Sequence, residues 1–280
     1  PDASAEAGED AGADASADSG PDASIDTSFD AGVSDAGDTG DGGDAGAAVD
    51  AGGVEIAATG NTTAVLAWVE STTRLAITAG RYSSSLSLLA RDSPIDFAGF
   101  GDARDPRLAS DGFSTAIAAW RQGPDAGMRI FASRYNVQLT SWGGATALSP
   151  ADAGNADAPE MAMNANGTSF VVWAQSNGDG GAKSLWATRG AGMVWDDAGI
   201  LDAPTWESVE SPTVVVSSFG QGIALWSRGA PAPAMSAIWS ALTNIGAEWS
   251  GIVSLETPGP GRSERPRAVI GADGIVDAVW

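Results

Sequence analysis

The chain has 280 residues, of which 43% are hydrophobic, so it is long enough to bury a sizeable core. It contains no cysteine and no histidine, which excludes disulfides, thiolate or histidine catalysis and metal sites built on these side chains. A formal net charge of −22 disfavours binding to nucleic acid or to an anionic membrane surface, because phosphate groups are repelled.

Residues 1–53 form an acidic low-complexity segment of Ala, Asp, Gly and Ser. The segment holds 14 of the 36 acidic residues and none of the 14 basic ones. It has little to bury and its charges repel one another, which predicts a disordered, extended linker. Its Asp-Gly stretch lacks the spacing of an EF-hand loop or of a calcium β-roll, so we expect no metal site there.

From residue 54 onward the sequence contains an internal repeat. Five segments of 15 residues end on a tryptophan and align without gaps, at Trp68, Trp120, Trp173, Trp226 and Trp280, with spacings of 52, 53, 53 and 54. Four of them open with a proline, at Pro106, Pro159, Pro212 and Pro266, while Val54 opens the first. This register predicts a structural unit of about 53 residues.

Each 15-residue segment predicts a β-hairpin, with a short apolar strand, a turn of Gly, Asn, Asp and Ser, and a second strand closing on the tryptophan. A third strand is predicted at 129–136, 184–191 and 237–244, and a fourth opens on Trp142, Trp195 or Trp249. Four short strands per repeat with a period near 50 are typical of the blades of a β-propeller. We therefore predict an all-β fold of antiparallel four-stranded blades.

The repeat sets the predicted domains. Residues 54–280 form the propeller, with blades at about 54–105, 106–158, 159–211 and 212–265 and a partial blade at 266–280. A propeller closes with about 4 to 8 blades, and this chain stops in mid-blade. We therefore expect a fragment that lacks further blades and a secretion signal.

The pattern Pro-x-apolar-Ala-x-(Asp/Asn), followed by an Ile-x-Ala-x-Arg-Tyr strand and a Trp-Gly pair, resembles the sialidase-like, BNR-type propeller repeats of secreted bacterial proteins. The acidic segment is similar to the spacers that follow the lipid-attachment cysteine of bacterial surface lipoproteins. This resemblance implies an extracytoplasmic protein at the cell surface, lipid-anchored through a segment before Pro1. It says little about activity, because such propellers serve many roles.

The predicted binding face is formed by the loops that connect the fourth strand of one blade to the first strand of the next. Trp206 is the one tryptophan outside the repeat, and an exposed indole beside Glu207 suits sugar stacking or a partner contact. The ten other tryptophans are expected in the core. The candidate ligand-binding residues on this face are Asp102, Arg104, Trp206, Glu207, Arg262 and Arg265.

Three functions remain open at this point. The first is a binding or interaction module for a carbohydrate or a surface protein, and the second is a sialidase-like carbohydrate-active enzyme. The enzyme is less favoured, because no Asp box is present and the recurring Arg81, Arg134 and Arg189 fall on third strands, where we expect them to face solvent. The third is a purely structural platform. We assign no catalytic residue, cofactor or metal, expect no nucleic-acid partner and no membrane-spanning segment, and leave the oligomeric state open.

Overall fold

The computed structural model describes residues 53–60, 63–83, 87–176, 181–204, 207–229, 236–243, 248–256 and 261–280. The predicted acidic linker, apart from Gly53, and the candidate Trp206 lie outside these ranges. The described part of the chain is built from β-strands and contains no helix, so it also contains no helix long and apolar enough to cross a membrane.

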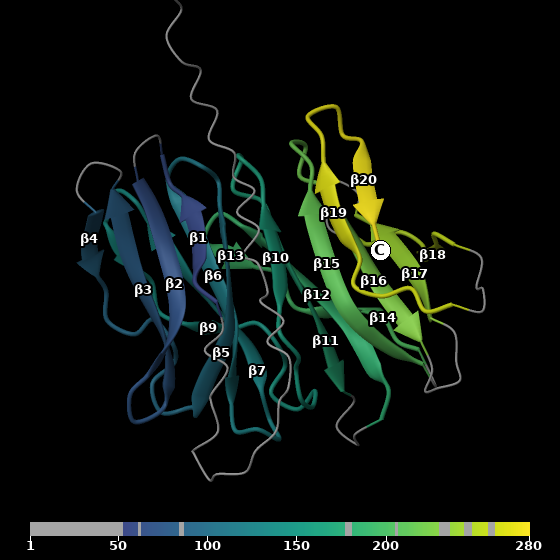
Figure 1. Cartoon of the computed structure of the whole chain (residues 1–280), viewed down its shortest axis with the longest axis horizontal. Coiled ribbons are helices and arrows are strands. Elements are labelled where there is room, and N and C mark those ends of the chain that lie inside the picture. The colour runs from purple at the N-terminus through teal and green to yellow at the C-terminus, as the bar shows by residue number, and fades with distance from the viewer. Residues whose placement is uncertain are drawn as a thin grey trace, which may run out of the picture. The chain divides into compact units, whose positions relative to one another are not determined.

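The strands form four antiparallel sheets and one hairpin, which we call blades 1 to 5 (Figure 1). Blade 1 comprises β1 (Glu55–Ala58), β2 (Thr63–Ser71), β3 (Leu75–Ser83) and β4 (Ser87–Arg91). Blade 2 comprises β5 (Asp102–Ser110), β6 (Thr115–Gly123), β7 (Arg129–Asn136), β8 (Ser141–Trp142) and β9 (Thr146–Ala147). Blade 3 comprises β10 (Glu160–Met163), β11 (Ser169–Ser176), β12 (Lys183–Ala191), β13 (Val194–Trp195) and β14 (Gly199–Asp202).

Blade 4 comprises β15 (Ser208–Val216), β16 (Gly222–Gly229), β17 (Ser236–Leu242) and β18 (Val253–Ser254), and the blade 5 hairpin comprises β19 (Arg267–Ile270) and β20 (Val276–Val279). The predicted all-β architecture of four-stranded antiparallel sheets is confirmed, as are the third strands, which are β7, β12 and β17. The first strands of blades 2 and 4 begin at Asp102 and Ser208, ahead of the prolines at which we placed the blade boundaries.

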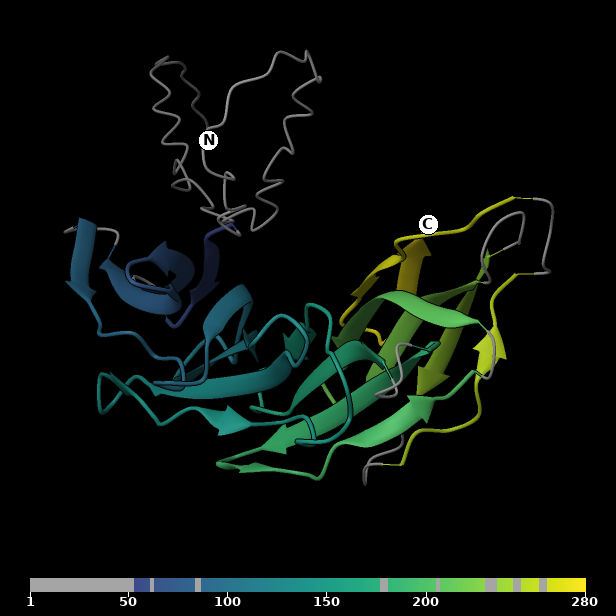
Figure 2. The ribbon, with the colours of Figure 1, turned by 90° about the horizontal axis from the view of Figure 1, so that it is seen from below.

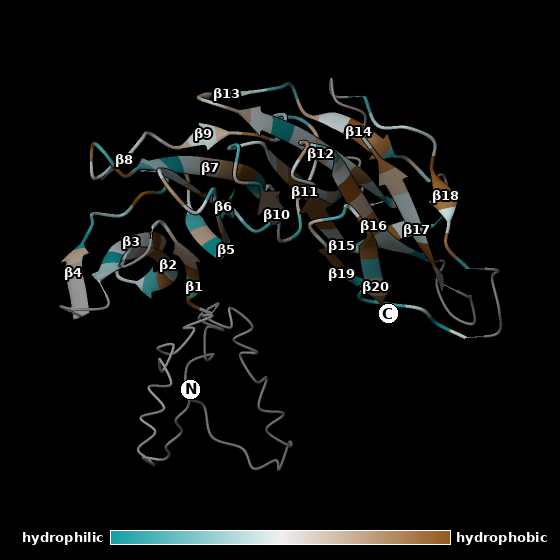
Figure 3. Ribbon diagram, turned by 90° about the horizontal axis from the view of Figure 1, so that it is seen from above, coloured by the Kyte–Doolittle hydropathy of each residue, from teal (hydrophilic) through white to brown (hydrophobic). Residues whose placement is uncertain are grey.

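The blades follow one another in chain order, and their first strands contact each other in the sequence β1, β5, β10, β15, β19 (Figure 2). In Figure 3 these first strands lie on one side of the row of sheets, while β8, β13 and β18 lie on the other side. The strands that the structure describes do not close the row into a ring. The first strands thus form a continuous inner layer on which residues of several blades can converge.

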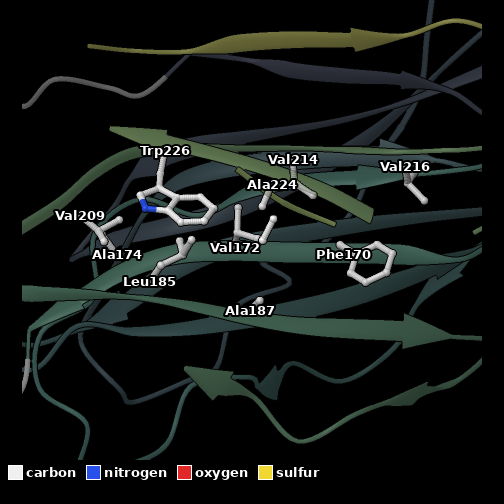
Figure 4. Close-up of a cluster of buried hydrophobic side chains, with 11 residues drawn as sticks. Phe170, Val172, Ala174, Leu185, Ala187, Val209, Val214, Val216, Ala224 and Trp226 are labelled. Carbon is white, nitrogen blue, oxygen red and sulfur yellow. The ribbon is translucent and has the colours of Figure 1, made fainter. Parts of the chain in front are cut away.

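The core lies between neighbouring blades. Figure 4 shows the cluster between blades 3 and 4, where Trp226, Phe170 and Leu185 pack against small residues such as Ala174. The hairpin tryptophans Trp120, Trp173 and Trp226 are completely buried, and Trp173 stacks on its cross-strand partner Trp186 at 6.4 Å. A buried indole needs a partner for its N–H group, and Trp173 donates to Gln175 Oε1 at 2.7 Å.

Not every tryptophan is in the core, which corrects the prediction. Only the three hairpin tryptophans of blades 2 to 4 are completely buried. Trp280 is 49% exposed, and the other six described tryptophans are half-buried, at Trp68, Trp142, Trp186, Trp195, Trp239 and Trp249. All of these six except Trp68 pack against the buried clusters. The predicted fourth strands are also shorter than expected. They are split into β8 with β9 and β13 with β14, and β18 begins after Trp249, which forms an isolated bridge with Thr243.

Candidate functional site

Each first strand has a proline end and a turn end. The proline end is marked by a buried proline in blades 2 to 5, at Pro106, Pro159, Pro212 and Pro266. The turn end leads into the hairpin turn toward the second strand. Because the first strands contact one another, the residues next to these prolines form one surface over several blades.

The backbone is strained at the proline end. The residue before the proline has a positive φ in blades 2, 4 and 5, at Asp105 (52°), Ser211 (49°) and Arg265 (53°). The strand registers of blades 2 and 4 also shift at this point. A non-glycine residue in this conformation costs roughly 1–3 kcal/mol and is found most often at functional sites. The strained backbone therefore makes the proline end a candidate location for a functional site.

Three charged side chains from three blades meet at the proline end. Glu55, Arg107 and Glu160 occupy the same register position, directly after Val54, Pro106 and Pro159. Arg107 donates from Nε and Nη2 to Glu160 Oε1, both at 3.2 Å, and from Nη1 to Glu55 Oε1 at 3.4 Å. All three side chains are about one-third exposed or less, at 33%, 32% and 26% respectively. One guanidinium thus bridges two carboxylates, which we call the Glu–Arg–Glu cluster.

The separation of the two carboxylates is compatible with bond cleavage between sugars. The two contact distances and the width of a guanidinium group place the carboxylates at most about 9 Å apart, below the upper limit of ~9.5 Å for glycosidase pairs. Burial raises the pKa of Glu55 above its ordinary value, an effect that Arg107 opposes and the nearby Glu160 reinforces. A carboxyl with a raised pKa keeps its proton at higher pH, as a general acid must.

A cavity of about 310 Å³ opens beside the cluster. Its walls come from blades 3, 4 and 5 and include Glu160, Asp157, Ser211, Arg265 and Arg267. The guanidinium groups of Arg265 and Arg267 form no ion pair with any described residue, whereas Asp157 is paired with Lys183 at 2.7 Å. The cavity therefore offers two cationic donors opposite carboxylates, an arrangement that can hold a hydroxylated ligand in one orientation.

The candidates predicted from sequence are scattered over this end of the fold. Asp102 accepts a bond from the Leu75 N–H at 3.0 Å, which lowers the pKa of Asp102 and ties blade 1 to blade 2. Arg104 contacts Asp102 at 3.1 Å and Asp125 at 3.7 Å. Neither of the two contacts the Glu–Arg–Glu cluster.

The remaining candidates come from blades 4 and 5. Glu207 pairs with Arg228 Nε at 2.5 Å, and Arg262 pairs with Glu264 at 2.7 Å. Arg265 is the one candidate that lines the cavity beside the cluster. Trp206 lies outside the described residues.

The sequence prediction missed Glu55, Arg107, Glu160 and Arg267. A signal for them existed, because the position directly after the proline is charged in four of the five repeats although the strand that follows is apolar. The predicted candidates lie in the preceding residues instead, two to seven positions before the equivalent position of each repeat. Arg81, Arg134 and Arg189, which we expected to face solvent, are half-buried in their third strands.

No protein-family model and no curated protein matches the chain. Solved structures do match its fold. An α-L-arabinanase from Penicillium chrysogenum, complexed with arabinobiose, aligns with a TM-score of 0.54 at 14% identity over 81% of this chain and 74% of the arabinanase. An α-L-arabinofuranosidase from Fusarium graminearum aligns with a TM-score of 0.53 at 10% identity, over 81% of this chain and 73% of its own.

A protein of unknown function from Dyadobacter fermentans aligns with a TM-score of 0.56 at 16% identity, over 81% of this chain and 73% of its own. At these identities the comparisons establish the fold alone. Together with the sheet order, they show that the chain has the architecture of a β-propeller.

Proposed function

We propose that this propeller is a carbohydrate-active enzyme that cleaves glycosidic bonds at the Glu–Arg–Glu cluster. The observation that carries the proposal is the bridging of Glu55 and Glu160, on first strands of different blades, by the single guanidinium of Arg107. Two carboxylates at this separation are the minimum equipment for hydrolysis of a glycoside. The chemistry needs neither histidine nor cysteine, both of which the chain lacks.

The two carboxylates have different surroundings and therefore different roles. Glu55, whose pKa is raised by burial, donates the proton to the departing sugar oxygen. Glu160 accepts two bonds from Arg107 and acts on the opposite side of the bond, either on the sugar carbon or on a water molecule. Arg107 orients both groups, and the cavity beside Glu160 receives the sugar.

The solved structures of similar fold suggest which glycans to test first. Two of them are an arabinanase and an arabinofuranosidase, so polymers of arabinose are the first substrates to try. We further propose that the enzyme works at the bacterial cell surface, on the acidic spacer of residues 1–53. In this setting Trp206, Arg262 and the other loop residues would border the path of the glycan.

A second function, glycan binding without turnover, is favoured by one feature of the same cluster. Arg107 lies between the two carboxylates and contacts both, so it neutralises charge and fills space that a sugar would need. A propeller that only binds would keep both carboxylates bound to Arg107 and would hold the glycan in the cavity lined by Arg265 and Arg267. This is the binding-module hypothesis from the sequence, placed at a set of residues that shares Arg265 with the predicted one.

The experiment is an assay of reducing sugar released from arabinan, arabino-oligosaccharides and sialylated glycans by the wild-type chain and by three variants. Glu55→Gln and Glu160→Gln keep the shape of each side chain and remove its acid–base function, so each should reduce turnover by about 100-fold or more. Glu70→Gln is the matched control, because Glu70 binds Thr78 and Arg91 in the outer part of blade 1 and should leave turnover unchanged.

Each outcome of the assay decides between the functions. Turnover that Glu160→Gln abolishes supports the enzyme, and sialic acid as the product would restore the sialidase hypothesis. Binding to the same glycans without turnover supports the binding module. Turnover that survives both substitutions refutes the cluster as the active site, and neither binding nor turnover supports the structural platform.

A further inference from the structure

Two further cavities lie on the outer side of the blades, at equivalent junctions. A cavity of about 330 Å³ lies where the segment after β4 of blade 1 meets the fourth-strand Trp142 of blade 2. A cavity of about 350 Å³ lies where the segment after β13 of blade 3 meets the corresponding Trp249 of blade 4. In both places, the cavity is lined by the segment that follows β4 or β13 in one blade and by the fourth-strand tryptophan of the next blade.

Each cavity has an indole supported from behind by a buried aromatic ring. Trp142 is half-buried and its ring centroid lies 5.4 Å from that of Tyr135, which is 3% exposed. Trp249 is half-buried and lies edge to face with Phe170, 5.6 Å away and 1% exposed. An indole held in place by a second ring and open to a cavity is a rigid stacking platform.

Carboxylates stand beside both indoles. Asp92 and Asp96 line the first cavity, and Asp196 and Asp197 line the second. In the first cavity, Asp92 Oδ2 and Trp142 Nε1 are both buried and have no hydrogen-bond partner among the described residues. Because both atoms are shielded from solvent, a hydroxyl group of a ligand can reach them only if the indole rotates, and such a contact would then satisfy both.

We infer that the two outer cavities are binding sites for neutral sugar residues of a polysaccharide. The apolar face of a sugar ring stacks on Trp142 or Trp249, and its hydroxyl groups donate to the adjacent carboxylates. Asp92 and Asp96 are ion-paired with Arg81 and Arg74, and Arg189 is the one cation in the second lining, so neither cavity has an excess of positive charge to attract uronic acids or phosphorylated sugars. The inference concerns the outer side of the blades and does not depend on the Glu–Arg–Glu cluster.

Two sites on one chain would hold a polysaccharide at two points. When both sites engage one polymer, the second contact is intramolecular, so the overall affinity exceeds that of either site. This predicts binding to long chains and weak binding to short oligosaccharides. The inner cluster would then act on a polymer that the outer cavities retain.

Trp195 of blade 3 provides a matched control. It occupies the same register position as Trp142 and Trp249 and is also half-buried, but it lines neither cavity. Its ring instead covers Gly190, where an added Cβ would lie 2.9 Å from Cζ3 of the indole. Replacing Trp195 removes an indole from the same register position, and this side chain lines neither proposed site.

The test is affinity gel electrophoresis of the full chain in gels that contain arabinan, xylan, β-glucan or polygalacturonate. We expect a neutral polysaccharide to retard the wild-type chain and polygalacturonate not to do so. Trp142→Ala and Trp249→Ala should each weaken the retardation at least about tenfold, as for a central aromatic contact, and the double variant should abolish it. Trp195→Ala should retain it.

A measurement on the wild-type chain guards against variants that fail to fold. The indole N–H signal of Trp142 in a ¹H–¹⁵N spectrum, assigned by its loss in Trp142→Phe, should shift when xylo- or arabino-oligosaccharides are added. Retardation by none of the three neutral polysaccharides overturns the inference. It is also overturned if the double variant is retarded like the wild type, or if the Trp142 signal does not move while the chain binds.

Discussion

The two ends of the first strands differ in what the repeats share. At the turn end, the same hydrogen bond recurs in all five blades. The N–H of the first turn residue donates to the carbonyl four residues later, at 2.8–3.1 Å, in Thr59, Asp111, Asn164, Ser217 and Gly271. In blades 2, 3 and 4 the side chain of this residue also accepts bonds from the turn, as Asn164 does from the N–H groups of Asn166 and Thr168 at 3.0 Å.

The proline end varies from blade to blade. The position after the proline is Glu55, Arg107, Glu160, Thr213 and Arg267 in turn. The preceding residue is Asp105, Ala158, Ser211 or Arg265, and three of these four have a positive φ. Backbone strain and charges of both signs occur together here, whereas no described non-glycine residue of the turn end has a positive φ.

This difference separates residues that form the blade from residues that give the surface its chemistry. A property that every repeat shares is required by the fold, because each blade must pack against the next in the same way. A property that differs between repeats at one register position is not required by the fold. The predictions below test this division, beginning with the residue on which the fold depends most.

Replacing a hairpin tryptophan should have the largest effect. Trp173 is completely buried, stacks on Trp186 and donates to Gln175, so Trp173→Ala creates a cavity and leaves the Gln175 carbonyl oxygen unpaired. We expect a loss of about 3–5 kcal/mol in the free energy of unfolding, measured by denaturant titration. Trp280→Ala, at the same register position but 49% exposed, should cost much less. Equal losses would contradict the packing described here.

The turn end should show the next largest effect. Asp111 Oδ1 accepts bonds from the N–H groups of Phe113, Ser114 and Thr115 at 2.8–3.0 Å, so Asp111→Ala leaves three donors without this partner. We expect a loss of about 1–3 kcal/mol in the free energy of unfolding at neutral pH.

The pH dependence of this loss distinguishes a charge effect from a packing effect. Burial alone would raise the pKa of Asp111, but the bonds from Phe113, Thr115 and Ser114 outweigh it and lower the pKa. A lowered pKa in the folded state stabilises the fold above the unfolded pKa of about 3.8 and loses this stabilisation as pH falls through the folded value. The difference between Asp111→Ala and wild type should therefore shrink in acid, and a constant difference would exclude the carboxylate as its cause.

The repeat explains why the fold could be predicted and the site could not. A periodic tryptophan reports a blade, because burial of a large side chain between sheets is the same requirement in each repeat. The split fourth strands were missed because they lie at the outer edge and pair on one side only, so their sequence is less constrained. The Glu–Arg–Glu cluster was missed because sequence spacing does not show that Glu55, Arg107 and Glu160, on three strands, point toward one another.

The strain at the proline end should be removable. Ser211 is exposed, has a φ of 49° and precedes Pro212, so Ser211→Gly allows this backbone conformation without steric cost. The extra freedom of glycine in the unfolded chain opposes the gain, so we expect a net stabilisation of up to about 1 kcal/mol in thermal unfolding. Ala158→Gly is the control, since Ala158 holds the same position without a positive φ and should lose stability instead. A destabilised Ser211→Gly would show that no strain is stored at this position.

The smallest effect should be that of Glu55 on the pH dependence of stability. Burial raises the pKa of Glu55 above the ordinary value of 4.5. Its stabilising contribution is therefore fully present below pH 4.5 and is lost as pH rises through the folded pKa. Glu55 is one-third exposed, so solvent screens its charge. We therefore expect Glu55→Gln to reduce the fall in the free energy of unfolding with rising pH by only a few tenths of a kcal/mol.

Glu70→Gln should act with the opposite sign, because the hydrogen bond from Arg91 lowers the pKa of Glu70. Paired unfolding curves between pH 3 and 8 would measure both, and the same sign for the two variants would refute the assignment of Glu55 as the proton-retaining carboxyl of the cluster.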